Sequence, residues 1–121
     1  MLVVSWVPVA LPERTDPSRL TRDGLARLDP VLEHRIRLGA SVLLSRVDAL
    51  SFSRLKELLG ATDGNLGAQM RKLEEANYVA VRKEFRNRKP LTWYSLTRAG
   101  KKALRSHLEA VQKVIRSTVL G

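Results

Sequence analysis

Apolar residues recur every three to four positions along much of this chain, and this spacing predicts helices. A central helix is expected to begin at Asp29-Pro30, because Asp is a good N-cap and proline fits the first helical position. Its apolar positions continue at helical spacing from Leu32 to Leu43. After a short strand at 50–52, a second helix is expected to start at Ser53 and to stop at Gly60.

A third helix is expected between Thr62 and Asn77. Thr62 is a good cap for its first turn, and Asn77 tolerates the left-handed conformation that ends helices. The stripe that would face the core consists of Leu66, Met70 and Leu73. The opposite face is expected to carry small and amide side chains first and basic ones later: Gly64, Asn65, Ala68, Gln69, Arg71 and Lys72.

Beyond the third helix the apolar period changes from 3.6 to 2, which predicts two strands. They cover residues 78–85 and 91–96, and the turn between them is rich in basic and amide side chains. Thr97 is then expected to cap a last helix that runs to about Val119. A proline-containing arm with a short helical turn at about 18–27 precedes all of these elements.

The order of these elements is helix, short strand, helix, helix, strand, basic turn, strand and helix. It predicts a mainly α protein with a small antiparallel β-wing (α+β), a winged helix-turn-helix with a long C-terminal dimerisation helix. We expect an N-terminal arm at 1–27, which either packs on the body or joins an interface. The DNA-binding winged helix is expected at 28–97 and the dimerisation helix at 98–121.

Composition excludes several classes of function. The chain has 121 residues and no cysteine, so we expect one domain without disulfides, thiolate metal sites or iron–sulfur clusters. No apolar run approaches the roughly 18 residues that a membrane span needs. Residues 1–11 are apolar but lack the basic region and cleavage site of a signal peptide. A cytoplasmic protein with no membrane partner is therefore expected.

The balance of charge favours a polyanionic partner. Lys and Arg total 22 against 12 Asp and Glu, a net charge of +10. Nine of the basic residues lie between Arg82 and Arg105, together with a single acid, Glu84. Nucleic acid is the commonest polyanion, and the alternative is a basic surface that is merely solvated.

Four segments carry short motifs: LDPVLEHRIR (28–37), LKELLGATDGNL (55–66), RKLEEANYV (71–79) and TWYSLTRAG (92–100). Together they resemble small winged-helix transcriptional regulators related to the MarR and ArsR types. The third is similar to their K-L-E-E-x-G-Y-[VI] motif, with Asn77 where glycine is usual, and the fourth to the T-x-Y-x-L-T-x-x-G exit of their wing. The similarity covers about residues 28–110 and implies a DNA-binding regulator.

Short polar residues near the start of the third helix suit the major groove, where Asn and Gln contact adenine edges bidentately. Asn65 and Gln69 are four residues apart and are expected to point away from the apolar stripe. The alternatives are a cap bond for Asn65 and a solvated face for the cations of the helix and the wing. The predicted DNA-binding residues are Thr62, Gly64, Asn65, Ala68, Gln69, Arg71, Lys72, Lys83, Arg86, Arg88 and Lys89.

Enzymatic chemistry finds little support in the sequence. The two histidines, His34 and His107, stand alone among helical residues, and no H-E-x-x-H motif supplies a metal site. The glycines at 60–67 lack the Lys-[ST] of a phosphate-binding loop. We therefore expect no catalytic residues, no metal and no cofactor.

The last predicted helix is longer than a winged domain needs, at roughly 33 Å. An apolar seam along it predicts a dimer interface made of Leu104, Leu108, Val111, Ile115 and Val119. The apolar arm around Val4, Trp6 and Val7 either crosses onto a second subunit or folds back over this helix, and the latter would leave a monomer.

These features predict a sequence-specific, double-stranded DNA-binding transcriptional regulator. It is expected to be a repressor that acts as a homodimer on a palindromic operator. The alternative is a winged-helix module that docks on RNA or another protein. No feature of the sequence identifies an effector ligand.

Overall fold

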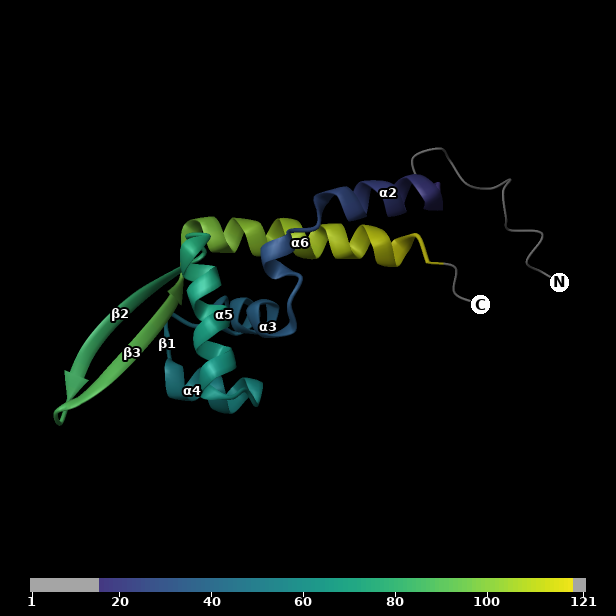
Figure 1. Cartoon of the computed structure of the whole chain (residues 1–121). Coiled ribbons are helices and arrows are strands. Elements are labelled where there is room, and N and C mark those ends of the chain that lie inside the picture. The colour runs from purple at the N-terminus through teal and green to yellow at the C-terminus, as the bar shows by residue number, and fades with distance from the viewer. Residues whose placement is uncertain (1–15, 119–121) are drawn as a thin grey trace. The chain divides into compact units, whose positions relative to one another are not determined.

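The computed structural model describes residues 16–118, which form two compact units. The larger unit consists of residues 29–105, and the smaller unit consists of residues 16–28 and 106–118. The last helix, α6 (Arg98–Arg116), contributes its first residues to the larger unit and the rest to the smaller one. Figure 1 follows the chain through its elements.

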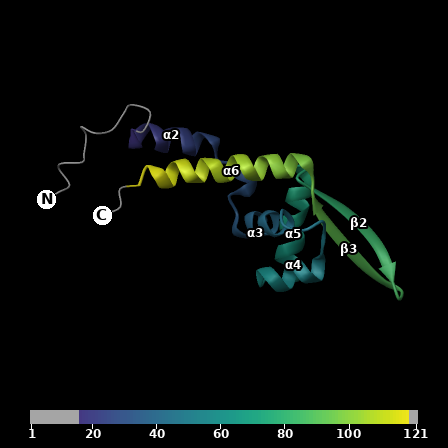
Figure 2. The same ribbon diagram turned by 180° about the vertical axis from the view of Figure 1, so that it is seen from behind.

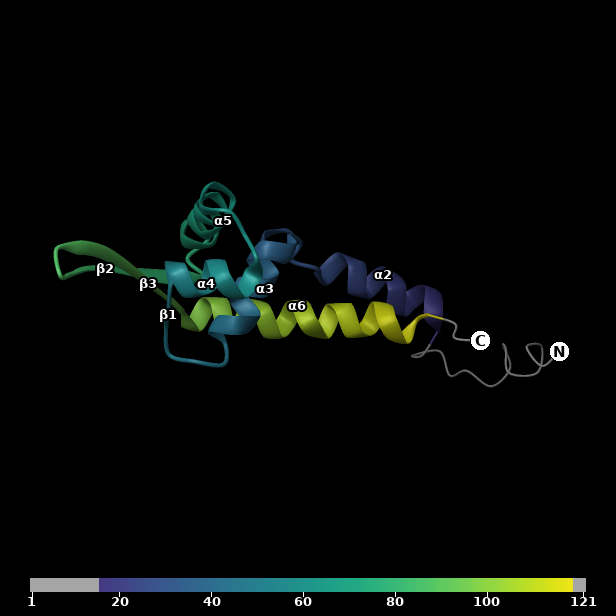
Figure 3. The ribbon, with the colours of Figure 1, turned by 90° about the horizontal axis from the view of Figure 1, so that it is seen from below.

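The larger unit contains helices and one small sheet. Its elements are η2 (Pro30–Leu32), α3 (Arg35–Leu44), β1 (Leu50–Ser51), α4 (Phe52–Leu59), α5 (Asp63–Glu75), β2 (Val79–Arg86), β3 (Lys89–Leu96) and the start of α6. The sheet is antiparallel with the order β1-β3-β2. Figures 1 and 3 agree that the β2–β3 hairpin projects beyond α4 and α5. The predicted fold class, helices with a small antiparallel wing, is confirmed.

One hydrophobic core joins every helix of the larger unit to the base of the hairpin. The predicted stripe on α5 is confirmed, since its three side chains are fully buried. On the hairpin, Tyr94 and Leu96 face the same core. The buried residues are Leu32, Ile36, Ala40, Leu44, Leu55, Leu66, Met70, Leu73, Val79, Tyr94, Leu96 and Leu104.

The α-helix predicted to begin at Asp29-Pro30 begins five residues later. The Asp29 carboxylate accepts a hydrogen bond from the Val31 amide at 2.9 Å, but it caps only the short 3-10 turn η2. The α-helix starts at Arg35, because Nδ1 of His34 accepts from the Ile36 amide at 3.1 Å. Asp and Pro thus start a helical turn as predicted, and an imidazole serves as the cap of α3.

The N-cap of helix α4 is Ser51, two residues before the predicted cap, Ser53. Ser51 supplies the N-cap, with its hydroxyl accepting from the Arg54 amide at 3.1 Å, so Ser53 lies inside the helix. Both serines are plausible caps in the sequence, and pairing of Ser51 with Trp93 in the sheet fixes which one is used. Gly60 ends the helix with φ +60°, as predicted.

The turns around α5 and the hairpin follow the predicted chemistry. Thr62 caps α5 by accepting from the Asn65 amide at 3.2 Å, and Asn77 adopts a left-handed φ of 64° just after the helix. The hairpin turns at Asn87 and Arg88, whose φ values are 52° and 67°. Two successive positive φ values are typical of the two-residue type I′ hairpin turn, whose twist matches that of the strands.

The smaller unit pairs α2 (Pro17–Arg27) with the end of α6, which confirms a helix near 18–27. Gly24 allows the close approach, because a Cβ there would lie 2.7 Å from Val114 and 2.8 Å from the Ala110 carbonyl oxygen. Thr21 donates to the Ser117 hydroxyl at 2.6 Å. Part of the last helix is therefore covered by the chain itself.

The predicted apolar seam along α6 is divided between the two units. Leu104, predicted to lie in the dimer interface, is only 5% exposed and belongs to the core of the larger unit, so it is not available to a second subunit. The helix begins by closing the core, and only its later residues are available to another subunit. Val119 and the arm around Val4, Trp6 and Val7 lie outside the described residues.

Among residues 16–118, the structure contains no helix whose length and hydrophobicity would suit a membrane span.

A hydrogen bond between residues far apart in the sequence joins the start of the larger unit to the hairpin. The Tyr78 hydroxyl donates to the Asp29 carboxylate at 2.5 Å. This bond, followed by burial and the charge of Asp29, raises the pKa of Tyr78 to about 12. The neutral phenol is therefore the form that the fold favours.

We expect Tyr78→Phe to lower the free energy of unfolding by about 1–2 kcal/mol at pH 8, because the carboxylate loses its donor. The contribution is fully present below the unfolded pKa of about 10 and is lost as the pH rises toward about 12. Urea unfolding of both proteins at pH 8 and pH 11 should show a smaller difference at pH 11. The same difference at both pH values would contradict this account.

Candidate nucleic-acid interface

Helix α5 presents a low, cationic outer face. Its apolar stripe is buried, and Gly64 and Arg71 are exposed on the other side. A Cβ built at Gly64 or Gly67 meets no atom within 4 Å, so neither glycine is required by packing inside the molecule. Arg71 and Lys72 form no ion pair with any residue between 16 and 118. The face therefore has small residues at its start and, further on, two cations without an ion-pair partner among the described residues, followed by the exposed Glu74 and Glu75.

Asn65 and Gln69 were predicted to share the outer face of α5, but only Asn65 lies there. Asn65 is exposed, but Gln69 is only 9% exposed and lies against α3. Its side-chain oxygen accepts from Arg37 at 2.5 Å, and its nitrogen donates to the Asn65 oxygen at 3.1 Å. Four residues along an α-helix advance the direction by about 40°, which turns Gln69 toward the buried stripe. The expectation that Gln69 points outward is wrong, while its role in DNA binding stays untested.

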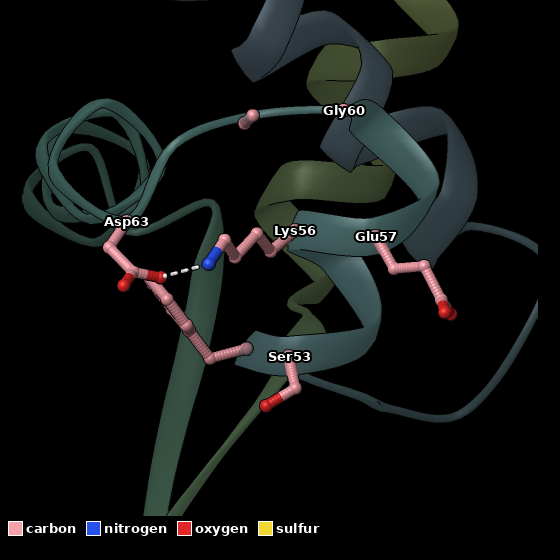
Figure 4. Close-up of a pocket in the computed structure, with 7 residues that line it drawn as sticks. Ser53, Lys56, Glu57, Gly60 and Asp63 are labelled. Atoms are coloured by element: carbon pink, nitrogen blue, oxygen red, sulfur yellow. Dashed lines mark ion pairs between the residues drawn. The ribbon is translucent and has the colours of Figure 1, made fainter.

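An acidic residue at the start of α5 is compensated by a neighbour. Lys56 of α4 forms an ion pair with the Asp63 carboxylate at 3.0 Å, across a shallow groove between α4 and the beginning of α5 (Figure 4). Ser53, Glu57 and Gly60 line the same groove. Because Lys56 is paired with it, Asp63 presents little uncompensated negative charge beside the outer face of α5.

The two faces of the hairpin differ in their chemistry. On one face, Glu84 is the shared partner of three side chains. It accepts from the Trp93 indole at 3.1 Å and lies 3.6 Å from Arg82 and 3.7 Å from Arg86. Arg82 also lies over the Trp93 ring, 5.9 Å from its centroid. This network holds two of the wing cations and spans both strands, which stiffens the hairpin.

The cations at the tip of the hairpin are not held in this way. Arg88 and Lys89 are exposed and form no ion pair with any residue between 16 and 118. Lys83 is also exposed, on the opposite face from Glu84. The tip, seen from the other side in Figure 2, lies at the free end of the two strands. The hairpin tip therefore carries exposed cations without an ion-pair partner among the described residues, at the end of two strands that the Glu84 network holds together.

One exposed residue of this tip is not among those that the sequence predicts to bind DNA. Phe85 is 77% exposed and lies opposite Pro90, next to the cationic turn. It follows the strand period that buries Val79, but the strand has left the core before reaching it. An aromatic residue directly before a basic turn was the signal that was available. Phe85 thus places an exposed aromatic ring beside the cations of the turn.

Two aromatic or imidazole groups near this surface have shifted pKa values. Burial, followed by the positive charges of Arg37, Lys72 and Arg35, lowers the pKa of His34. A neutral imidazole is what the cap of α3 requires, since its Nδ1 accepts a hydrogen bond. Burial raises the pKa of Tyr94. Both pKa shifts therefore follow from how the two side chains are packed in the fold. Separately, residues 16–118 contain no group of three or more His, Cys, Asp or Glu that could hold a metal ion.

A small helical core that presents one amphipathic helix beside a basic β-hairpin defines a winged helix-turn-helix protein. Residues 36–115 match the family described as a winged helix DNA-binding domain, and the chain belongs to this family. The family and the fold point to a DNA-binding transcriptional regulator.

Several known proteins are similar to this chain. A transcriptional regulator homologue from Pyrococcus horikoshii superposes with a TM-score of 0.73 at 25% identity, covering 84% of this chain and 99% of that one. AbsC, a MarR family transcriptional regulator from Streptomyces coelicolor, has a TM-score of 0.57 at 25% identity, covering 86% and 72%. An uncharacterized protein of Methanocaldococcus jannaschii is 32% identical over 73 residues, 60% of this chain and 79% of that one. The predicted resemblance to MarR-type winged-helix regulators is thereby confirmed.

Gly64 tests whether the start of α5 closely approaches DNA. Gly64→Leu should leave the fold intact, because the Cβ position is open, while duplex affinity falls by roughly tenfold or more as the side chain keeps the helix from the bases. Gly64→Ala is the matched control and should change the free energy of unfolding by less than about 1 kcal/mol. Urea unfolding and duplex titration measure the two effects. Wild-type affinity in Gly64→Leu would show that this part of α5 lies away from DNA.

Proposed function

We propose that this protein is a sequence-specific regulator of transcription that binds double-stranded DNA as a homodimer on a palindromic operator and acts as a repressor. The observation that carries the proposal is a set of exposed cations in one compact unit, Arg71 and Lys72 on α5 and Arg88 and Lys89 at the hairpin tip, which form no ion pair within residues 16–118. A repressor of this kind blocks transcription by occupying the site that polymerase or a neighbouring factor needs. Its ligand is chromosomal DNA, so we propose the cytoplasm as its location.

In this proposal α5 enters the major groove. The groove is about 12 Å wide and accepts a helix whose outer face is low. Thr62, Gly64 and Ala68 allow the close approach, and Asn65 reaches a base edge. Arg71 and Lys72, further along the helix, contact phosphates. Phosphate contacts give position and affinity, and the base contact gives sequence specificity.

The hairpin contributes the second part of the interface. Lys83, Arg88 and Lys89 neutralise phosphates on either side of the adjacent minor groove, and Phe85 adds an apolar contact. Arg86 is exposed at the same tip but already pairs with Glu84, so we expect a smaller contribution from it. The network around Glu84 supports this role because it holds the strands together while leaving the two tip cations available. A stiff support loses little conformational entropy when its tip binds.

The proposed dimer surface consists of exposed apolar residues of the smaller unit. Leu25, Leu108 and Ile115 are 55%, 40% and 58% exposed, and Val111 lies between the last two on α6. Leu108, Val111 and Ile115 recur at helical spacing and therefore share one face of α6, and a contiguous apolar face is typical of a surface that another protein covers. A second copy of the chain is the partner that a palindromic site requires, since its two half-sites lie about 34–36 Å apart.

Selection of bound sequences from random duplex DNA tests the function. We expect an enriched palindrome, tight binding of that duplex and much weaker binding of random duplex in the same salt. Single-stranded RNA of the same length is the comparison. Preferential RNA binding, or failure to enrich any duplex sequence, would contradict the proposal and favour a module that docks on RNA or protein.

The wing is tested by the salt dependence of binding. Replacing both Arg88 and Lys89 with Ala should lower the slope of log affinity against log salt by about one to two units per subunit. The loss should be similar for operator and random duplex, because phosphates carry no sequence information. The charge-matched control replaces Lys101 and Lys102, two exposed cations outside the proposed interface, and should keep the wild-type slope. An unchanged slope in the wing variant would place the hairpin off the DNA.

The dimer is tested by adding charge to its proposed surface. Leu108→Asp with Ile115→Asp should give a folded monomer, because both side chains are exposed within residues 16–118. Operator affinity should fall by roughly 100-fold or more, since the two half-sites are no longer bound together. Gln112→Asp, an exposed polar position on the same helix, is the control. Sedimentation of the wild type as a monomer at micromolar concentration without DNA would rule out the dimer.

A further inference from the structure

Arg37 lies at the start of a chain of hydrogen bonds that ends on the exposed side of α5. Its Nε donates to the Val31 carbonyl at 2.6 Å, which fixes the guanidinium, and its Nη1 donates to the Gln69 side-chain oxygen at 2.5 Å. Gln69 in turn donates from its nitrogen to the Asn65 oxygen at 3.1 Å. All of these residues belong to the larger unit.

The chemistry of the groups determines which way each amide points. A guanidinium has only donors, so the amide oxygen of Gln69 must face Arg37. The amide nitrogen of Gln69 has only donors as well, and it must therefore face the oxygen of Asn65. The orientation of both amides follows from Arg37, without reference to solvent or ligand. Gln69 is almost fully buried, which leaves it little freedom to turn.

We propose that Arg37 and Gln69 are positioning residues that make Asn65 a donor toward DNA. With its oxygen held by Gln69, Asn65 presents its N–H groups to the outside. Bidentate recognition of adenine needs an outward oxygen to accept from N6 as well as an outward N–H. Guanine presents N7 and O6, both acceptors, in the major groove. Asn65 therefore selects guanine at its position in the operator, where sequence considerations alone favoured adenine.

This inference rests on the proposed function, because it concerns the base that α5 contacts. It adds a base preference at one operator position, which neither the winged-helix fold nor the positive charge of the surface would produce. A winged helix with the same surface charge but a reversed Asn65 amide would present an acceptor and select a base with an N–H group. The base preference at a single operator position thus reports the orientation of one side chain.

The variant Gln69→Glu tests the inference. A carboxylate has only acceptors when ionised, so it still binds Arg37 but must accept from the nitrogen of Asn65, which turns the Asn65 oxygen outward. Selection from a library randomised at each operator position should show guanine at the Asn65 position in the wild type. In Gln69→Glu the preference should change to adenine or cytosine by roughly tenfold, with other positions unchanged.

Controls separate this inference from the proposed function. Arg37→Lys keeps a donor toward Gln69 and should retain the wild-type preference, whereas Asn65→Ala should abolish preference at that position alone. Wild-type guanine preference in Gln69→Glu, or a wild type that selects adenine at the Asn65 position, would overturn the positioning role while leaving the regulator intact. If Gln69→Glu binds no duplex, Arg37→Met decides: a relaxed preference supports the role, and an unchanged one overturns it. A wild type that selects no duplex at all would instead reject the proposed function.

Discussion

The burial of one narrow side of α5 is the constraint on which the rest of the larger unit depends. Leu66, Met70 and Leu73 are fully buried, and they fix how the helix is rotated about its axis. That rotation decides which side chains face outward and turns Gln69 toward Arg37. A one-residue change in the helical register would move every side chain by about 100° and replace the cationic outer face with a different one.

Much of the fold was predictable because its determinants are local. Gly60, Thr62 and Asn77 impose cap and turn conformations through their own side chains or lack of one, and the structure has all three as predicted. The hydrophobic period likewise identified the first strand of the hairpin within one residue at each end and the second within two residues at its start. The family match over residues 36–115 confirms the class of protein that these local patterns predicted.

The remainder depended on contacts between distant residues. Whether Ser51 or Ser53 caps α4 is set by pairing with β3, and the burial of Leu104 is set by where α6 meets the core. Gln69 lies at the edge of the buried stripe, where a helical pattern alone assigns it to either side, and only the position of Arg37 resolves it. Part of the candidate site was therefore predictable as a set of residues, but the directions of its amides were not.

The hairpin turn has a consequence for how such a protein can change over generations. Asn87 and Arg88 both adopt left-handed conformations, which cost a residue with a Cβ about 1 kcal/mol that glycine does not pay. A glycine at position 88 would thus make the isolated turn more favourable while removing a cation from the tip. Selection for stability and selection for the tip charge act in opposite directions on this one codon. A lineage in which position 88 becomes glycine has relaxed the demand for that charge.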